Sequence, residues 1–130
     1  MLDFTFLETA IKRNHTVSEV EHGQMELADI HMESAKGKAP EAPKITILMP
    51  CLNEFETIGT CIKKAKTWAI ASSRDVEILV ADNGSTDGSQ EVARSMGVRV
   101  VEINEKGYGN ALYYGIEAAR GDFVIMADSD

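Results

Sequence analysis

From Lys44 onward, short apolar runs rich in β-branched residues alternate with longer segments whose apolar residues have helical spacing. This alternation is typical of βαβ units around a parallel sheet, because two parallel strands need a long crossover connection between them. The four apolar runs are nearly continuous, which is expected when helices cover both faces of a sheet. They predict four mainly buried strands at residues 45–49, 76–81, 98–103 and 123–127.

Three helices are predicted between these strands. The first has an apolar stripe that runs from Ile58 to Ala69 at spacings of three and four residues. The second is expected to begin at residues 85–87, because Asp87 followed three residues later by Gln90 resembles a capping box. The third is expected at residues 110–119. The pattern predicts a Rossmann-like α/β fold whose four strands, numbered along the chain, lie in the order 3-2-1-4.

The first 43 residues differ from the rest of the chain. A segment with two prolines, residues 39–44, separates them from the α/β pattern and predicts a boundary there. We therefore divide the chain into an N-terminal extension, residues 1–43, and an α/β domain, residues 44–130. The extension has sparse apolar residues at loose helical spacing, so short helices and disorder both remain open, and few contacts with the core are expected.

Composition excludes several classes of protein. The formal net charge of −8, without a clustered basic face, argues against binding of duplex nucleic acid. No stretch approaches the roughly 18 apolar residues of a membrane span, and the acidic, interrupted N-terminus does not resemble a secretory signal. We expect a cytoplasmic protein whose Cys51 and Cys61 are reduced. All three histidines precede Lys44, so the core supplies neither a Ser-His-Asp triad nor a His-ligated zinc site.

Every predicted strand ends in a polar, turn-forming segment, at residues 50–54, 82–87, 104–110 and 128–130. In open α/β sheets, ligands bind beyond the carboxyl ends of the strands. Asp128 and Asp130 flank one residue, a spacing that lets two carboxylates reach a common hard cation, with a solvated acidic segment as the alternative. Asp82, just before Gly84, is placed to accept hydrogen bonds from a nucleotide base, with an Asx turn as the alternative.

The other candidates lie after the first and third strands. Pro50 fixes the first turn, and Asn53 and Glu54 are expected at the start of the next helix, where the helix dipole alone also favours an acid. Gly107 permits close approach of the backbone, and Lys106 is placed to reach a phosphate, with a plain loop as the alternative.

Four motifs, in this order and spacing, resemble those of family 2 glycosyltransferases: ITILMPCLNE, ILVADNGSTDGS, KGYGNAL and ARGDFVIMADSD. The resemblance covers residues 44–130. Within the family, KGYGNALYYGIEAARGD is most similar to enzymes that transfer a sugar from a nucleotide to a polyprenyl phosphate. The chain departs from the family at Leu52, where an aromatic residue is frequent, and at Asn83, which replaces a frequent second Asp.

The resemblance implies a GT-A-type half-domain that binds a UDP- or GDP-sugar with Mg or Mn. It identifies Asp128 and Asp130 as the DxD metal ligands. It also implies inverting transfer of the sugar to a lipid phosphate or a saccharide, at the cytoplasmic face of a membrane. The catalytic base for this transfer is expected beyond Asp130. The alternatives are a noncatalytic nucleotide-binding fragment and a partner-binding module. The residues expected to contact the nucleotide sugar are Pro50, Leu52, Asn53, Glu54, Asp82, Gly84, Lys106, Gly107 and Ser129.

Overall fold

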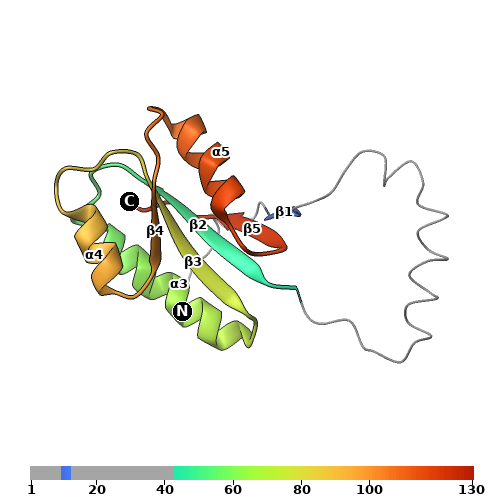
Figure 1. Cartoon of the computed structure of the whole chain (residues 1–130). Helices are drawn as coiled ribbons and strands as arrows, with labels where there is room; N and C mark the ends of the chain where they lie inside the picture. Colours follow the sequence, from blue (N-terminus) through green and yellow to red (C-terminus); the bar gives the residue numbers. More distant parts are fainter. Residues whose placement is uncertain (1–9, 13–42) are drawn as a thin grey trace, which may run out of the picture.

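The computed structural model describes residues 10–12 and 43–130, and its helices and strands alternate along the α/β domain (Figure 1). The elements in chain order are β1 (Ala10–Lys12), β2 (Ile45–Cys51), α3 (Ile58–Ser72), β3 (Val76–Asp82), α4 (Ser89–Ser95), β4 (Arg99–Glu102), α5 (Tyr108–Ala118) and β5 (Phe123–Met126).

The strands form one five-stranded sheet in the order β1-β5-β2-β3-β4. β5, β2, β3 and β4 are parallel, and their order confirms the predicted 3-2-1-4 arrangement. In the register, Cys51 pairs with Asp82, and Asp82 pairs with Glu102. The carboxyl ends of these strands therefore lie at one edge of the sheet, as predicted.

Helices cover both faces of the sheet, with α3 and α4 on one face and α5 on the other (Figure 1). Successive residues of a strand point to opposite faces. Ile47 and Met49 of β2 accordingly join the core cluster under α3, whereas Leu48 joins the cluster under α5. The two clusters confirm the expected α/β sandwich, because each helix layer buries its own set of strand residues.

α5 approaches the sheet closely at Gly115. A Cβ atom added there would lie 2.7 Å from Leu48 Cδ1 and 3.1 Å from Ala81 Cβ, so no side chain fits without a shift of the sheet residues. This contact fixes the distance of α5 from β2 and β3, and with it the position of the loop that precedes α5.

The expected burial of the third parallel strand and the expected conformation of part of the N-terminal extension are wrong. β4 is half-buried and not mainly buried, because it is the outer strand of the sheet and pairs with β3 alone. Residues 10–12, expected to be helical or disordered with few core contacts, form strand β1 and pair antiparallel with β5, whose edge offers unpaired backbone groups. The rest of the extension lies outside the described residues, and the boundary at residue 43 remains a prediction.

The predicted capping box at Asp87 and Gln90 is also wrong. α4 begins at Ser89 with Gly88 as its N-cap, and no side chain caps it there. The Gln90 side chain instead donates a 2.6 Å hydrogen bond to Asp82 Oδ2, because the buried carboxylate at the end of β3 lies within its reach. In the described part of the chain, none of the helices has the length and apolar character needed to cross a membrane.

Alanine at Gly115 tests the close approach of α5. Gly115→Ala is expected to lower the free energy of unfolding by about 1–2 kcal/mol, because overpacking outweighs the better helix propensity of alanine. Gly109→Ala in the same helix, where an added Cβ meets nothing within 4 Å, is the control and is expected to be neutral or stabilising. Chemical denaturation measures both. Equal effects of the two substitutions would contradict the packing argument.

Candidate nucleotide-binding cleft

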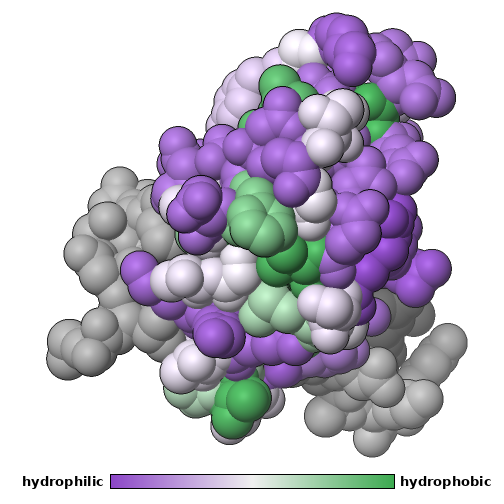
Figure 2. All heavy atoms as spheres, turned by 90° about the vertical axis from the view of Figure 1, so that its left-hand side faces the viewer, coloured by the Kyte–Doolittle hydropathy of each residue, from purple (hydrophilic) through white to green (hydrophobic). Residues whose placement is uncertain are grey.

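A cleft of about 320 Å³ opens at the carboxyl edge of the sheet. Residues that end or follow all four parallel strands line it. Figure 2 looks onto this edge and shows hydrophobic residues at its centre surrounded by hydrophilic ones. The predicted site residues that the cleft brings together are Pro50, Leu52, Glu54, Lys106, Gly107, Asp128, Ser129 and Asp130.

The acidic wall of the cleft is the segment after β5. Ser129 is buried, and its hydroxyl donates a 2.9 Å hydrogen bond to the carbonyl of Pro50. Its own carbonyl accepts a 2.7 Å hydrogen bond from the Thr57 hydroxyl. The side chains of Asp128 and Asp130 on either side of this anchor are exposed. Ser129 is thus a structural anchor in this wall, which sets the two carboxylates at the cleft.

Glu54 adds a third carboxylate to these two. Burial raises the pKa of the Cys61 thiol, against the lowering effect of the Lys64 charge. The carboxylates of Asp130, Asp128 and Glu54 raise that pKa further, so all three lie near Cys61. The cleft therefore has a strongly negative side. Both cysteines are free thiols.

Asn53 and Glu54 lie in the loop between β2 and α3, so their expected position at the start of a helix is wrong. α3 begins only at Ile58, although the Glu54 carbonyl accepts a hydrogen bond from the Ile58 N–H. Asn53 has a φ of 54°, which takes the chain out of helical geometry. The cause is a set of hydrogen bonds that hold this loop against the loop after β3. They are Asn53 N to Ser85 Oγ (2.8 Å), Thr86 N to Asn53 Oδ1 (2.8 Å), Glu54 N to Ser89 Oγ (2.9 Å) and Phe55 N to Asp87 Oδ2 (3.0 Å).

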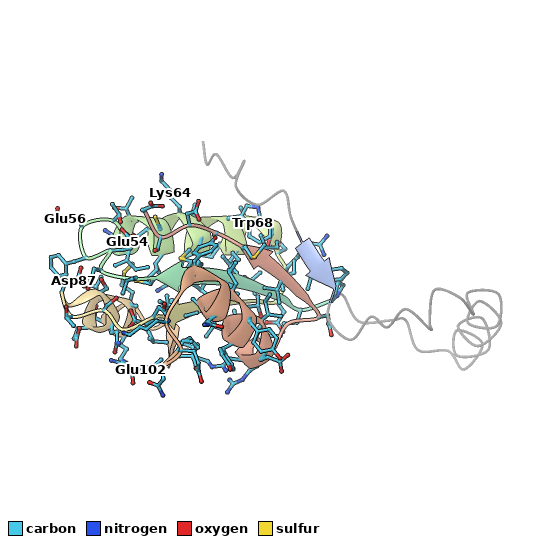
Figure 3. All side chains as sticks on the ribbon, turned by 90° about the horizontal axis from the view of Figure 1, so that it is seen from above. Glu54, Glu56, Lys64, Trp68, Asp87 and Glu102 are labelled. Carbon is cyan, nitrogen blue, oxygen red and sulfur yellow. The ribbon has the colours of Figure 1, made fainter. Side chains whose placement is uncertain are left out.

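These contacts separate structural residues from cleft residues. Asn53 does not line the cleft, and its amide is used in the loop contact. Asp87 accepts hydrogen bonds from Phe55 and from Ser89, so it joins the loop after β2 to the start of α4. Glu54 lies in the cleft because its neighbours in the loop are held from the other side. Figure 3 shows Glu54 and Asp87 at the same end of the sheet.

Asp82 is fully buried at the end of β3 and does not line the cleft. Its Oδ2 atom accepts hydrogen bonds from Gly84 N (3.0 Å), Ser85 N (2.9 Å) and Gln90 Nε2 (2.6 Å). Burial acts to raise its pKa, but the hydrogen bonds from Ser85, Gln90 and Gly84 outweigh burial and hold the pKa below its usual value. Asp82 is therefore ionised at neutral pH. Its Oδ1 atom is buried without a hydrogen-bond partner.

Lys106 lines the cleft from the loop between β4 and α5. Its Nζ atom is close to Gly84, where an added Cβ would lie 2.5 Å from it. Gly84 has a φ of 100° and Gly107 a φ of 119°, conformations that favour glycine at both positions. Gly84 itself lies outside the cleft.

Sequence reasoning missed Asn83 as a cleft residue. Asn83 is buried and lines the cleft beside Lys106 and Gly107. Its side chain bonds three backbone groups of the loop before α5, which no local pattern indicates. The available signal was strand alternation, because the residue after Asp82 must face the opposite side of the sheet.

The arrangement suits a ligand that carries negative charge and a cation together. Among residues 10–12 and 43–130, no three His, Cys, Asp or Glu side chains are grouped closely enough to hold a metal ion by themselves. Two carboxylates with ligand oxygens, however, form the oxygen donor set that Mg²⁺ uses when it binds with a nucleotide.

The Ser89 hydroxyl tests how the Glu54 loop is held. It accepts the Glu54 N–H and donates a 2.5 Å hydrogen bond to Asp87 Oδ1. Ser89→Ala leaves the Glu54 N–H without this acceptor and is expected to lower the free energy of unfolding by about 1–3 kcal/mol. Ser95→Ala in the same helix, which removes only a bond to the Val92 carbonyl, is expected to change it by less than about 0.5 kcal/mol. Thermal or chemical unfolding of both variants measures the difference, and equal stability would contradict this role of Ser89.

The chain is similar in sequence and in structure to several known proteins. A low-salt glycan biosynthesis hexosyltransferase of Haloferax volcanii is 41% identical over 93 residues, which cover 68% of this chain and 21% of the relative. The crystal structure of glucosyl-3-phosphoglycerate synthase from Mycobacterium tuberculosis with Mn²⁺, UDP and phosphoglyceric acid has a TM-score of 0.60 and 33% identity. That match covers 76% of this chain and 36% of that one. Mannosyl-3-phosphoglycerate synthase from Rubrobacter xylanophilus has a TM-score of 0.64 at 27% identity, over 83% of this chain and 36% of that one.

The chain thus spans between about a fifth and about a third of the length of these proteins. The model of the glycosyl transferase family 2 domain matches residues 46–130, which contain the four parallel strands from Thr46 onward and every residue of the cleft. The chain belongs to glycosyl transferase family 2.

Proposed function

We propose that this protein binds a nucleoside diphosphate sugar, UDP- or GDP-linked, in the cleft and supplies the donor-binding part of a glycosyltransferase. The observation that carries the proposal is the gathering of Glu54, Asp128, Asp130 and Lys106 around one cleft at the carboxyl edge of the sheet. The similar M. tuberculosis synthase was crystallised with Mn²⁺ and UDP, which supports the same ligand class here.

Asp128 and Asp130 are the proposed ligands of Mg²⁺ or Mn²⁺. Their carboxylates are exposed at the cleft, and hard oxygen donors fit these cations. The diphosphate of the donor and water would supply the remaining ligands. When bound, the metal would offset the negative charge that develops on the leaving nucleoside diphosphate. Ser129, the one residue between the two ligands, would contribute by fixing the backbone that carries them.

Asp82 is proposed to recognise the nucleotide base. Its Oδ1 atom is an ionised acceptor with no partner, and burial of such a group costs free energy until a donor reaches it. An N–H group of the base is a suitable donor. Opening of the loop around Gly84 would let the base reach this atom. Leu52, which is 50% exposed, and Pro50 would form an apolar wall for the base.

Lys106 and the backbone of Gly107 are proposed to contact the diphosphate from the side opposite the carboxylates. The proposed acceptor is a polyprenyl phosphate, as the motif from residue 106 to residue 122 suggests, with a saccharide as the alternative. An acceptor oxygen would attack the anomeric carbon with inversion, and the bond from that carbon to the diphosphate oxygen would break to release the nucleoside diphosphate. The base that takes the acceptor's proton is proposed to lie beyond Asp130.

Removal of one metal ligand tests the cation site. Asp130→Asn is expected to weaken UDP binding in the presence of Mn²⁺ at least about tenfold, or about 1.4 kcal/mol, because the cation loses a charged ligand. Chelation is expected to weaken binding to the unsubstituted protein by a similar factor. Asp75→Asn, the same change in an exposed residue at the opposite end of β3, is the control and is expected to have no effect. Calorimetric titration with UDP measures the affinity of the two variants and of the unsubstituted protein with Mn²⁺ and with a chelator.

Equal UDP affinity with and without Mn²⁺ would contradict the metal assignment. If the protein binds UDP with Mn²⁺ but releases no UDP from UDP-glucose in the presence of a polyprenyl phosphate or a saccharide, binding without transfer is the better description.

Asp82→Asn tests base recognition separately. Its amide oxygen would still accept the three hydrogen bonds of Oδ2, but an NH₂ group would replace the free acceptor and face the base donor. UDP affinity is therefore expected to fall at least about tenfold, while the ratio of affinities with and without Mn²⁺ stays unchanged. Unchanged affinity would contradict the base contact, and a lost Mn²⁺ dependence would place Asp82 in the metal site instead.

A further inference from the structure

We infer that Asn83 is a positioning residue that holds the phosphate side of the cleft through the loop between β4 and α5. This inference rests on the proposed nucleotide binding. It concerns a residue that would act through Lys106 and Gly107 and would not itself perform chemistry.

The loop before α5 has little else to hold it. Residues 104–107 are all exposed, so burial of apolar side chains does not fix their position. A loop of this kind depends on hydrogen bonds from a rigid element for a defined conformation. The neighbouring contacts are the Ile103 N–H to the Asp82 carbonyl at one end, and the Asn110 side chain to the Lys106 carbonyl and the Ala111 N–H to the Gly107 carbonyl at the other.

Asn83 supplies the bonds between those two ends. Its Nδ2 atom donates to the carbonyls of Ile103 (3.2 Å) and Glu105 (2.7 Å), and its Oδ1 atom accepts the Gly107 N–H (2.8 Å). Both donor hydrogens and the acceptor of one amide are thus used on one loop. The bonded residues Ile103, Glu105 and Gly107 lie on both sides of Lys106 in the sequence, so these bonds define where the Lys106 side chain leaves the loop.

Asn83 is itself fixed to the centre of the sheet. It follows β3 directly, it is only 4% exposed, and its N–H donates a 2.9 Å hydrogen bond to the Cys51 carbonyl at the end of β2. The amide therefore connects the rigid ends of two central strands with an exposed loop. An amide side chain can make all three of these hydrogen bonds, whereas a carboxylate has no hydrogen to donate to the two carbonyls.

Asn83→Ala tests the inference, with Asn104→Ala in the same loop as the control, because Asn104 is exposed. Asn83→Ala is expected to weaken UDP binding with Mn²⁺ at least about tenfold, and Asn104→Ala less than about threefold. The effect of each substitution on UDP affinity is measured in the otherwise unsubstituted protein and again in the Lys106→Ala variant. If Asn83 acts through Lys106, the effect of Asn83→Ala is largely lost in that background, because the two changes are not additive.

Full additivity with Lys106→Ala would overturn the inference, since a general loss of structure would weaken binding in either background. So would an unchanged UDP affinity of Asn83→Ala. Failure of the unsubstituted protein to bind either UDP or GDP would overturn the proposed function instead. A measurement without substitution covers the case in which Asn83→Ala does not fold. The Gly107 amide is expected to exchange with solvent at least about tenfold more slowly than the Lys106 amide, and equal exchange would contradict the hydrogen bond to Asn83.

Discussion

Asp82 and Asn83, consecutive residues at the end of the interior strand β3, hold two loops at the carboxyl edge of the sheet. The Asp82 carboxylate gathers the backbone of Gly84 and Ser85 and the side chain of Gln90. The Asn83 amide gathers the loop before α5. Because strand alternation sends the two side chains in opposite directions, one dipeptide can organise two loops. The side of the cleft formed by the loop before α5 is held by the Asn83 bonds and not by burial of its own side chains, which are exposed.

Comparison with a partly buried carboxylate shows why Asp82 is unusual. Glu77, at the other end of β3, pairs with Arg99 at 3.2 Å and accepts hydrogen bonds from Thr46 and the backbone of Arg120. Burial acts to raise its pKa, but these partners outweigh burial and lower it. Both of its oxygens have partners, and a cation offsets its charge. Asp82 is held by uncharged donors alone and keeps one free oxygen, which is the arrangement expected of a group that awaits a ligand.

The sequence predicted the parallel strands because they are continuous apolar runs, a signal that depends only on nearby residues. It also predicted which edge of the sheet carries the cleft, since every strand ends in polar residues. It did not predict the loop contacts, because Asn53, Ser89 and Asn83 find their partners across the fold. The apparent capping box failed for the same reason: Gln90 has a buried carboxylate within reach. β1 was missed because the open edge of β5, not the composition of the extension, determines its pairing.

The central claim is that metal and nucleotide meet at the carboxyl edge of the sheet, between the carboxylates after β5 and the loop that Asn83 holds. Paramagnetic broadening by Mn²⁺ in the presence of UDP tests it most directly, with Mg²⁺ as the diamagnetic reference. Amide resonances of Glu54, Gly107 and residues 128–130 are expected to broaden first. Broadening centred on the second cleft, at the opposite edge near Lys44, Arg99 and Arg120, or the absence of any localised broadening, would contradict the account.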